Sequence, residues 1–242
     1  MHDAGGVVRE TAVIEWVLFP PPGLGKFGSL NEIREFRARV LYDNGRRPRF
    51  RQADGRYTDE DRLDEAAYHL SARLAGALAG CVRLLPMSDH SSCLTEQLLG
   101  PSRFASMLRG LRVSRSQMIE GGRWIVDPTR RGARLGVLLA AGGVAVARAL
   151  EYEVLCCPVG TARKQDRVLA RLGLAAVPDI PLVAVPHLDD QLRVMHVFPS
   201  RPVPQLRELM DAMAIRLDLP QRPRTFAGSG QQHSEVSCRK CV

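Results

Sequence analysis

Apolar side chains recur at helical spacing between residues 30 and 42, and this pattern predicts a helix. Ser29 and Glu32 fit a capping box at its start, and Asn44-Gly45 marks its end. The segment before it contains the run FPPPGLGKFG, in which three prolines and three glycines exclude a helix. Residues 1–28 are therefore predicted to be an irregular N-terminal arm.

Shorter apolar segments with turn residues between them predict strands farther along the chain. Residues 66–86 are predicted to form two strands around Ala75-Gly76, and residues 44–64, polar and densely charged, a mobile loop. The remaining predicted elements are a helix near 103–111, a strand at 123–126, a long buried helix at 129–150, a strand at 152–159, a helix at 162–174, a strand at 191–199 and a helix at 204–217. This order predicts a single α/β domain with a mixed sheet over residues 29–218.

The amino-acid composition indicates the kind of partner that the protein would bind. The 242 residues are 45% hydrophobic, enough for a core, and carry a formal charge of +8, which favours an anionic partner such as a phosphate, an acidic protein, nucleic acid or a membrane surface. A solvated basic surface without a partner fits equally well. Residues 219–242, rich in Gly, Ser, Gln and Arg, are predicted to be disordered.

Targeting signals are not evident in the sequence. The N-terminus lacks a basic segment followed by an apolar one, and the longest apolar run is shorter than the roughly 20 residues that cross a bilayer. We therefore expect a cytoplasmic protein with reduced thiols and no membrane span.

The segment VDPTRRGARLG, residues 126–136, places a glycine- and arginine-rich turn between a strand and a helix. The unpaired amides and the dipole of a helix N-terminus favour an anion, and arginines add charge-assisted contacts suited to a diphosphate. A basic helix start that faces solvent is the alternative, and spacing alone does not decide between the two.

This segment resembles the acyl-CoA-binding motif R-G-x-G-x-G of GNAT-type N-acyltransferases, except that Arg134 stands where the motif has glycine. The resemblance implies that the turn holds the phosphorylated arm of an acyl donor and that the preceding strand carries its acyl-pantetheine part. The implied donor-binding residues are Trp124, Ile125, Val126, Arg131, Gly132, Ala133, Arg134 and Gly136.

Three further segments resemble acyl-homoserine lactone synthases: EGGRWIVDP from Glu120, GCVRLLP from Gly80, and DEDRLDEAAYHL with its paired aspartates. The resemblance implies a GNAT-like α/β fold, with a mixed, mostly antiparallel sheet that is flanked by helices and splayed at the acyl-donor strand. The residues that it assigns to catalysis are Glu120, Arg123 and Arg83, and those that it assigns to the acceptor are Arg37, Asp61 and Asp64.

The chain departs from that synthase pattern at three positions. An aromatic residue is replaced by Leu41, a tryptophan by Arg47, and a serine by Gly122. The related N-acyl amino acid synthases share the scaffold and accept amino acids. The acceptor is therefore predicted to be a small amine, either an amino acid or S-adenosylmethionine, whose product would be a quorum-sensing lactone.

The sequence leaves two interpretations open for several residues. Glu120 could orient the acceptor amine or take its proton, or be a surface carboxylate before a strand. Arg83 interrupts an apolar strand and so needs a carboxylate partner, for which Asp61, Asp64 and Glu120 are candidates. Arg123 could pair with Glu120 or bind an acidic group.

The predicted chemistry is direct transfer. Cys156 and Cys157 lie in a predicted buried strand, where cysteine is normally a small hydrophobe, and Leu169 stands where many GNAT enzymes have a tyrosine acid. We expect no tightly bound cofactor and no metal, because a single CxxC at Cys238 and Cys241 is a weak zinc signal.

The donor is predicted to be a thioester of acyl carrier protein or of CoA. Four basic residues of one predicted helix could dock an acidic carrier protein, or form a solvated face: Arg163, Lys164, Arg167 and Arg171.

Two rival functions remain. One is an acetyl-CoA-dependent acetyltransferase. The other is a basic nucleic-acid-binding module, which the 5% content of aromatic residues makes unlikely.

Overall fold

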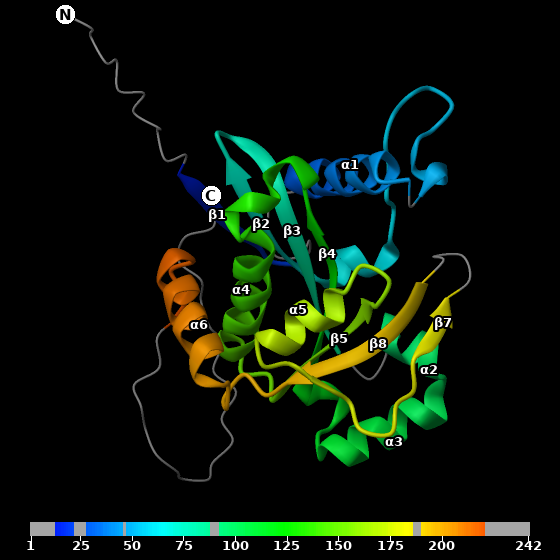
Figure 1. Ribbon diagram of the computed structural model, residues 1–242, viewed down its shortest axis with the longest axis vertical. Helices are drawn as coiled ribbons and strands as arrows, with labels where there is room; N and C mark the ends of the chain where they lie inside the picture. The colour runs from blue at the N-terminus through cyan, green and yellow to red at the C-terminus, as the bar shows by residue number, and fades with distance from the viewer. Residues whose placement is uncertain (1–12, 22–27, 46, 88–91, 186–189, 221–242) are drawn as a thin grey trace, which may run out of the picture.

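A computed structural model describes residues 13–21, 28–45, 47–87, 92–185 and 190–220, which form a mixed α/β fold around one large sheet (Figure 1). The strands are β1 (Ile14–Phe19), β2 (Tyr68–Leu74), β3 (Ala77–Pro86), β4 (Met118–Val126), β5 (Val154–Gly160), β6 (Ala175–Ala176), β7 (Val183–Val185) and β8 (Asp190–Val197). The α-helices are α1 (Gly28–Asp43), α2 (Leu94–Leu99), α3 (Pro101–Leu111), α4 (Leu135–Ala149), α5 (Gln165–Arg171) and α6 (Pro204–Arg216).

The sheet has the order β1-β2-β3-β4-β5-β8-β6, with β7 also paired to β8. All neighbouring strands are antiparallel except β4 and β5, which are parallel. The predicted hairpin around Ala75-Gly76 is confirmed, because both residues have positive φ angles between β2 and β3. The mixed, mostly antiparallel sheet is as the sequence predicts.

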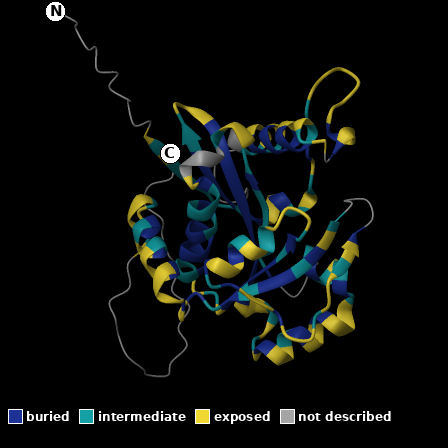
Figure 2. Ribbon diagram, viewed as in Figure 1, coloured by how far each residue is buried: buried dark blue, intermediate teal, exposed yellow. Residues whose placement is uncertain are grey.

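Helices cover both faces of this sheet. One face is packed by α4, α5 and α6, and the other by α1 at one end and by α2 and α3 at the other. Figure 2 shows the central strands as buried and the outer sides of α3 and α6 as exposed. Within the described residues, no helix combines the length and the apolar character needed to span a bilayer.

The N-terminal arm contains a strand, so the prediction that it is irregular throughout is wrong. Ile14–Phe19 forms the edge strand β1, whose residues pair with β2 from Ile14 opposite Leu74 to Phe19 opposite His69. Trp16 and Leu18 pack against the core. The prolines that exclude a helix begin only after this strand, so they end β1 without preventing it.

The long helix predicted at residues 129–150 is divided in two. A 3-10 helix, η5 (Pro128–Ala133), precedes α4, and Arg134 between them has the left-handed φ of 53°. A left-handed residue cannot continue a right-handed helix, so α4 begins anew at Leu135. The prediction that this helix is largely buried is confirmed.

The polar segment at residues 44–64 is more structured than the predicted mobile loop. It contains a 3-10 helix at Pro48–Phe50 and a β-bridge between Arg51 and Tyr57, and a further 3-10 helix, η3 (Arg62–Ala66), follows. Its carboxylates explain the difference, since Asp59 and Asp64 are buried at 1% and 0% exposure against arginines of α1 and of the sheet. Charge density therefore orders this segment instead of loosening it.

Strands β4 and β5 separate at their C-terminal ends. They pair only from Met118 opposite Val154 to Glu120 opposite Cys156, although β4 continues to Val126 and β5 to Gly160. The edge of β4 beyond Glu120 is therefore not covered by β5, and its backbone groups there are open to another partner. This is the splay that the sequence resemblance implies.

Candidate active site

A bulge in β4 shapes the splay. The register with β3 shifts between Cys81 opposite Ile125 and Arg83 opposite Gly122, so β4 carries an extra residue there, and Arg123 has a left-handed φ of 52°. A bulge reverses the alternation of side chains. Trp124 consequently faces α4, where its indole Nε1 donates to Gly136 O at 3.0 Å, while Ile125 packs with α1.

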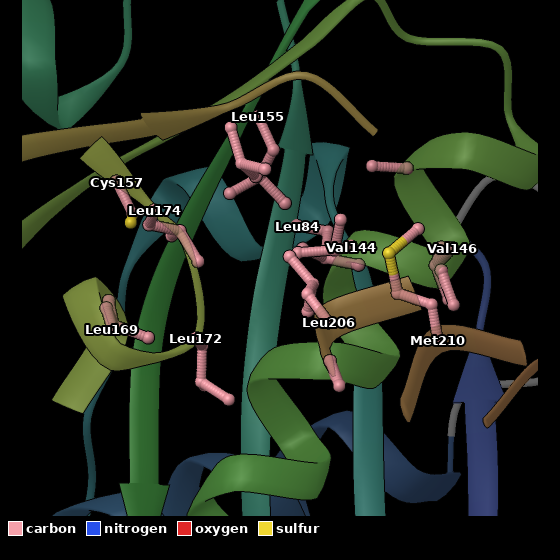
Figure 3. Close-up of a cluster of buried hydrophobic side chains, with 14 of the residues drawn as sticks. Leu84, Val144, Val146, Leu155, Cys157, Leu169, Leu172, Leu174, Leu206 and Met210 are labelled. Atoms are coloured by element: carbon pink, nitrogen blue, oxygen red, sulfur yellow. The ribbon is translucent and has the colours of Figure 1, made fainter. Parts of the chain in front are cut away.

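A cavity of about 170 Å³, here called cavity 1, lies in the splay. Gly121 to Ile125 of β4 form one wall, and Leu155 to Gly160 of β5 contribute to the other. Its apolar end is lined by Leu84, Val144, Leu155, Cys157, Leu169 and Leu174. In Figure 3, Cys157, Leu169 and Leu174 lie together at one side of the view, and Leu84 and Val144 lie to their right. The open edge of β4 thus borders an apolar chamber.

A second cavity of about 340 Å³, here called cavity 2, adjoins the first. The two share Leu41, Trp124, Ile125 and Gln165 in their linings. Its charged lining residues are Arg134 and Arg163, which lie beside the start of α4 and before α5. A molecule that extends along β4 could therefore place an anionic group near these arginines and an apolar group in cavity 1.

The predicted donor-binding residues divide between described and undescribed parts. Trp124, Ile125, Val126, Arg134 and Gly136 all line cavity 2, whereas the surroundings of Arg131, Gly132 and Ala133 lie outside what the structure describes. At Gly136, an added Cβ would lie 3.3 Å from the Trp124 ring, so glycine permits the close approach of α4 to β4. Arg134, which replaces the motif glycine, retains a glycine-like backbone conformation.

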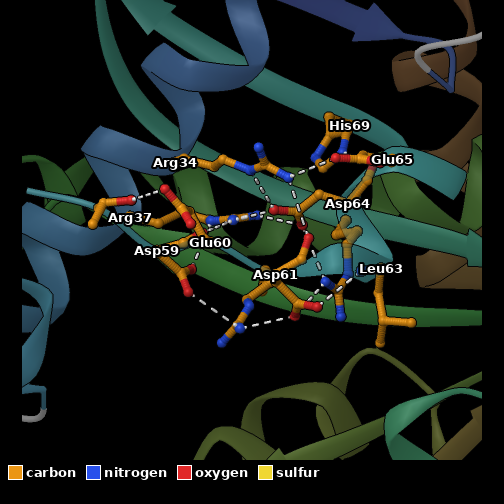
Figure 4. Close-up of polar contacts among 12 residues, drawn as sticks. Arg34, Arg37, Asp59, Glu60, Asp61, Leu63, Asp64, Glu65 and His69 are labelled. Atoms are coloured by element: carbon orange, nitrogen blue, oxygen red, sulfur yellow. Dashed lines mark hydrogen bonds and ion pairs between the residues drawn. The ribbon is translucent and has the colours of Figure 1, made fainter.

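The predicted acceptor residues meet in a buried network of ion pairs (Figure 4). Arg37 of α1 contacts Asp64 at 2.6 Å and Asp59 at 2.9 Å, and Arg83 of β3 contacts Asp61 at 2.7 Å and Asp64 at 3.1 Å. The network thus joins α1 and η3 to the sheet, and Arg83 has two of the three partners that the sequence offers.

Arg123 and Arg34 complete this network. The Nη2 atom of Arg123 lies 2.9 Å from Asp61 and 3.2 Å from Asp59, and Arg34 Nε lies 3.1 Å from Asp64. The sequence prediction missed both Arg34 and Asp59. The signal was present, because Arg34 is one helical turn before Arg37 and Asp59 opens the acidic segment that contains Asp61 and Asp64.

The network favours the ionised forms of Asp61 and Asp64. Burial raises the pKa of Asp64, but hydrogen bonds and charge from Arg37, with the charge of Arg83, outweigh it and hold that pKa far below its usual value. Asp61 shows the same balance, in which Arg83 outweighs burial and lowers the pKa. Burial lowers the pKa of His69, which contacts Asp64 O at 2.9 Å.

Glu120 lies apart from these arginines. Its carboxylate, on a residue only 1% exposed, accepts from Leu94 N at 3.1 Å, Thr95 N at 2.7 Å and Thr95 Oγ1 at 2.6 Å. Glu120 therefore binds the first turn of α2 and is not among the residues that line cavity 1. Within the described part, the structure shows Arg123 paired with Asp59 and Asp61 rather than with Glu120.

The buried cysteines are poor nucleophiles. Cys156 and Cys157 lie in β5, as predicted, and Cys157 lines cavity 1. Burial raises the pKa of the Cys157 thiol to about 12, so its thiolate is scarce near neutral pH. Cys238, Cys241 and the rest of the tail lie outside the described residues.

Comparison with known proteins identifies the type of domain that holds this site. Residues 36–141 match the family described as acetyltransferase (GNAT) domain, whereas no curated protein matches the sequence. Among solved structures, the CoA-dependent acyl-homoserine lactone synthase BjaI with MTA is 18% identical, with a TM-score of 0.61 over 86% of this chain and 92% of that one. The same synthase has also been solved with SAM and isopentyl-CoA.

Two further structures show the same arrangement. The acyl-homoserine lactone synthase LasI is 15% identical, with a TM-score of 0.55 over 87% of this chain and 100% of that one. FeeM, an N-acyl amino acid synthase from uncultured soil microbes, is 13% identical, with a TM-score of 0.51 over 78% of this chain and 94% of that one. Residues 36–141 thus match a GNAT acetyltransferase domain, and the chain has the fold of acyl-homoserine lactone synthases and of an N-acyl amino acid synthase.

Proposed function

We propose that the protein is an N-acyltransferase that moves an acyl group from a thioester of CoA or acyl carrier protein to the amine of an amino acid or of S-adenosylmethionine. The observation that carries this proposal is the splay between β4 and β5, which contains cavity 1 and continues into cavity 2. The phosphorylated arm of the donor would lie beside Arg134, and its acyl chain in the apolar end of cavity 1. The thioester would then lie against the open edge of β4.

The proposed reaction needs no covalent enzyme intermediate. The amine nitrogen attacks the thioester carbonyl carbon, and backbone amides on the open edge of β4 stabilise the negative oxygen of the tetrahedral intermediate. Collapse breaks the carbon–sulfur bond and gives an amide and a thiol, which receives the proton lost by the amine. A thiolate with a pKa of about 8.5 leaves readily without a dedicated acid.

Arg83 and Glu120 are proposed to act by positioning. Arg83 holds Asp61 and Asp64 beneath the bulge that carries Arg123, and Glu120 fixes the start of α2, whose Leu94 lines cavity 1. Glu120 is therefore proposed to set the shape of the pocket, because its carboxylate oxygens already accept three hydrogen bonds.

The function is tested by release of free thiol from a series of acyl-CoA thioesters and acyl carrier protein, with and without amino acids or S-adenosylmethionine. We expect release that depends on both substrates, and an N-acyl product by mass spectrometry. Cys157→Ala should keep this activity, because transfer is direct. Loss of activity in a folded Cys157→Ala protein, with a trapped acyl-enzyme in the wild type, would contradict the mechanism.

The apolar end of cavity 1 favours chains longer than acetyl. Activity with acetyl-CoA alone would instead support an ordinary acetyltransferase. No transfer from any thioester, together with salt-dependent retention of nucleic acid, would refute the acyltransferase proposal.

A further inference from the structure

Two arginines are the only charged residues that line cavity 1 within the described part of the chain. They are Arg47 and Arg123, and no carboxylate accompanies them in that lining. Arg47 is 9% exposed and immediately precedes the 3-10 helix at Pro48–Phe50, while Arg123 occupies the bulge of β4. The charged part of the described cavity lining, here called the cationic region, is therefore made of arginine alone.

Within the described part of the chain, Arg123 also belongs to the ion-pair network behind this region. Four arginines, Arg34, Arg37, Arg83 and Arg123, face three aspartates, Asp59, Asp61 and Asp64. A fourth carboxylate, on Glu65, has a side chain that is 71% exposed and lies 3.9 Å from Arg34, so the network pairs its arginines with carboxylates. The described lining of cavity 1 itself contains two arginines and no carboxylate, and this lining favours an anionic group on the ligand.

Arg123 retains donor capacity toward such a group. Both of its ion pairs use the same atom, Nη2, and its buried Nε makes no hydrogen bond to the described residues. A guanidinium offers five N–H donors in a planar fork, which matches a carboxylate. The arrangement thus suits a bound carboxylate better than a bound cation.

The chemistry of the proposed reaction decides which substrate bears that carboxylate. The anionic arm of the donor has its own arginines, Arg134 and Arg163, in cavity 2, and the acyl chain needs the apolar end of cavity 1. The acceptor amine must reach the thioester at the edge of β4, beside Arg123. A carboxylate close to the amine, as in an α-amino acid, would then contact the cationic region.

We infer that Arg47 and Arg123 select an acceptor by its α-carboxylate, and that the preferred acceptor is an amino acid with an uncharged or acidic side chain. A sulfonium or a basic side chain would add positive charge beside these two arginines, in a lining that has no carboxylate among the described residues. This inference rests on the proposed function and decides between its two acceptors in favour of the amino acid.

The test compares kcat/KM for a neutral amino acid, its carboxamide, lysine and S-adenosylmethionine, with one acyl thioester. We expect the wild type to favour the amino acid over its carboxamide by about 10- to 100-fold, the range of one charge-assisted hydrogen bond. Arg47→Gln should reduce this preference about tenfold, through KM, and Arg47→Lys should restore part of it. Arg49→Gln, on an exposed residue of the adjacent 3-10 helix, is the matched control and should change nothing.

Thermal unfolding of each variant separates misfolding from loss of recognition. Equal use of the amino acid and its carboxamide, a preference for S-adenosylmethionine, or an unchanged preference in a folded Arg47→Gln protein would each overturn the inference. If no amine is acylated, the proposed function fails. The carboxylate site is then judged by whether an N-acyl amino acid raises the Tm more than its carboxamide, in the wild type but not in Arg47→Gln.

Discussion

Among the three aspartates of the ion-pair network, Asp64 pairs with the most arginines. Arg34, Arg37 and Arg83 all contact its carboxylate, and Arg37 is fully buried. Removing one partner of a buried pair leaves an uncompensated charge and costs about 3–5 kcal/mol. We therefore predict that Asp64→Asn lowers the free energy of unfolding by about that amount, as measured by urea denaturation.

Asp54→Asn provides the matched control for this substitution. Its partner Arg56 is 2.6 Å away, but both side chains are exposed, and such pairs contribute about 0–1 kcal/mol. Equal losses in the two variants would show that burial does not determine the importance of these ion pairs.

Residues of the buried ion-pair network also determine how the stability of the protein responds to acid. Asp61 and Asp64 have lowered pKa values in the folded protein, so their contribution is complete above the unfolded value of about 3.9 and is lost as the pH falls through the lower folded values. His69, whose pKa burial lowers, begins to reduce stability below about pH 6.5. We predict urea midpoints that decline below pH 6.5 and more steeply below pH 4. A midpoint that rises on acidification would contradict this assignment.

At the scale of elements, Arg134 joins two helices through a strained backbone. A left-handed non-glycine residue costs about 1–3 kcal/mol, partly offset by the extra unfolded-state freedom of glycine. Arg134→Gly should therefore leave stability unchanged or raise it by up to about 1 kcal/mol, while it raises KM for acyl-CoA because a cation leaves cavity 2. Ala75→Gly, in the exposed hairpin turn, should give only the backbone effect. Equal KM values for the two variants would exclude Arg134 from donor binding.

Two adjacent glycines of α4 meet different surroundings. A Cβ at Gly143 would lie 3.4 Å from Leu84 and would narrow cavity 1, whereas a Cβ at Gly142 would lie 2.7 Å from Leu70 and 3.1 Å from Met213. Both gain about 0.5–1 kcal/mol of helix propensity, but only Gly142→Ala overpacks the core, at a cost of about 1–3 kcal/mol.

We therefore predict that Gly143→Ala is the more stable variant in thermal unfolding. Because it narrows cavity 1, the same variant should shift thiol release toward shorter acyl chains, while Gly142→Ala should keep the wild-type chain preference. An unchanged chain preference in Gly143→Ala would place the acyl chain elsewhere.

Periodicity predicted most helices and strands because their burial leaves a local pattern, as in α6 and β8. It missed β1, whose paired residues in β2 lie 50 to 60 positions away, and the break at Arg134, which is a backbone conformation that leaves no periodic signal. That Arg83 pairs with carboxylates was predictable, since a buried guanidinium needs an anionic partner. The contact of Glu120 with the start of α2 could not be predicted, because it depends on packing between distant segments.

At the scale of the whole molecule, the charge of +8 bears on the identity of the donor. Arg167 and Arg171 are exposed basic residues of α5, the helix that follows Arg163 of the cavity 2 lining. If the donor is carried by acidic acyl carrier protein, this surface steers its approach, and kcat/KM should fall steeply as ionic strength rises. With acyl-CoA the salt dependence should be weaker.

The double variant Arg167→Glu/Arg171→Glu separates these donors, because neither residue lines cavity 1 or cavity 2. We predict at least a tenfold lower kcat/KM with acyl carrier protein at low salt, and little change with acyl-CoA. An equal reduction with both donors would mean that the two charges act on the fold or on CoA itself. No reduction with either would identify the face of α5 as a solvated surface, because steering requires that the charges of the partners attract.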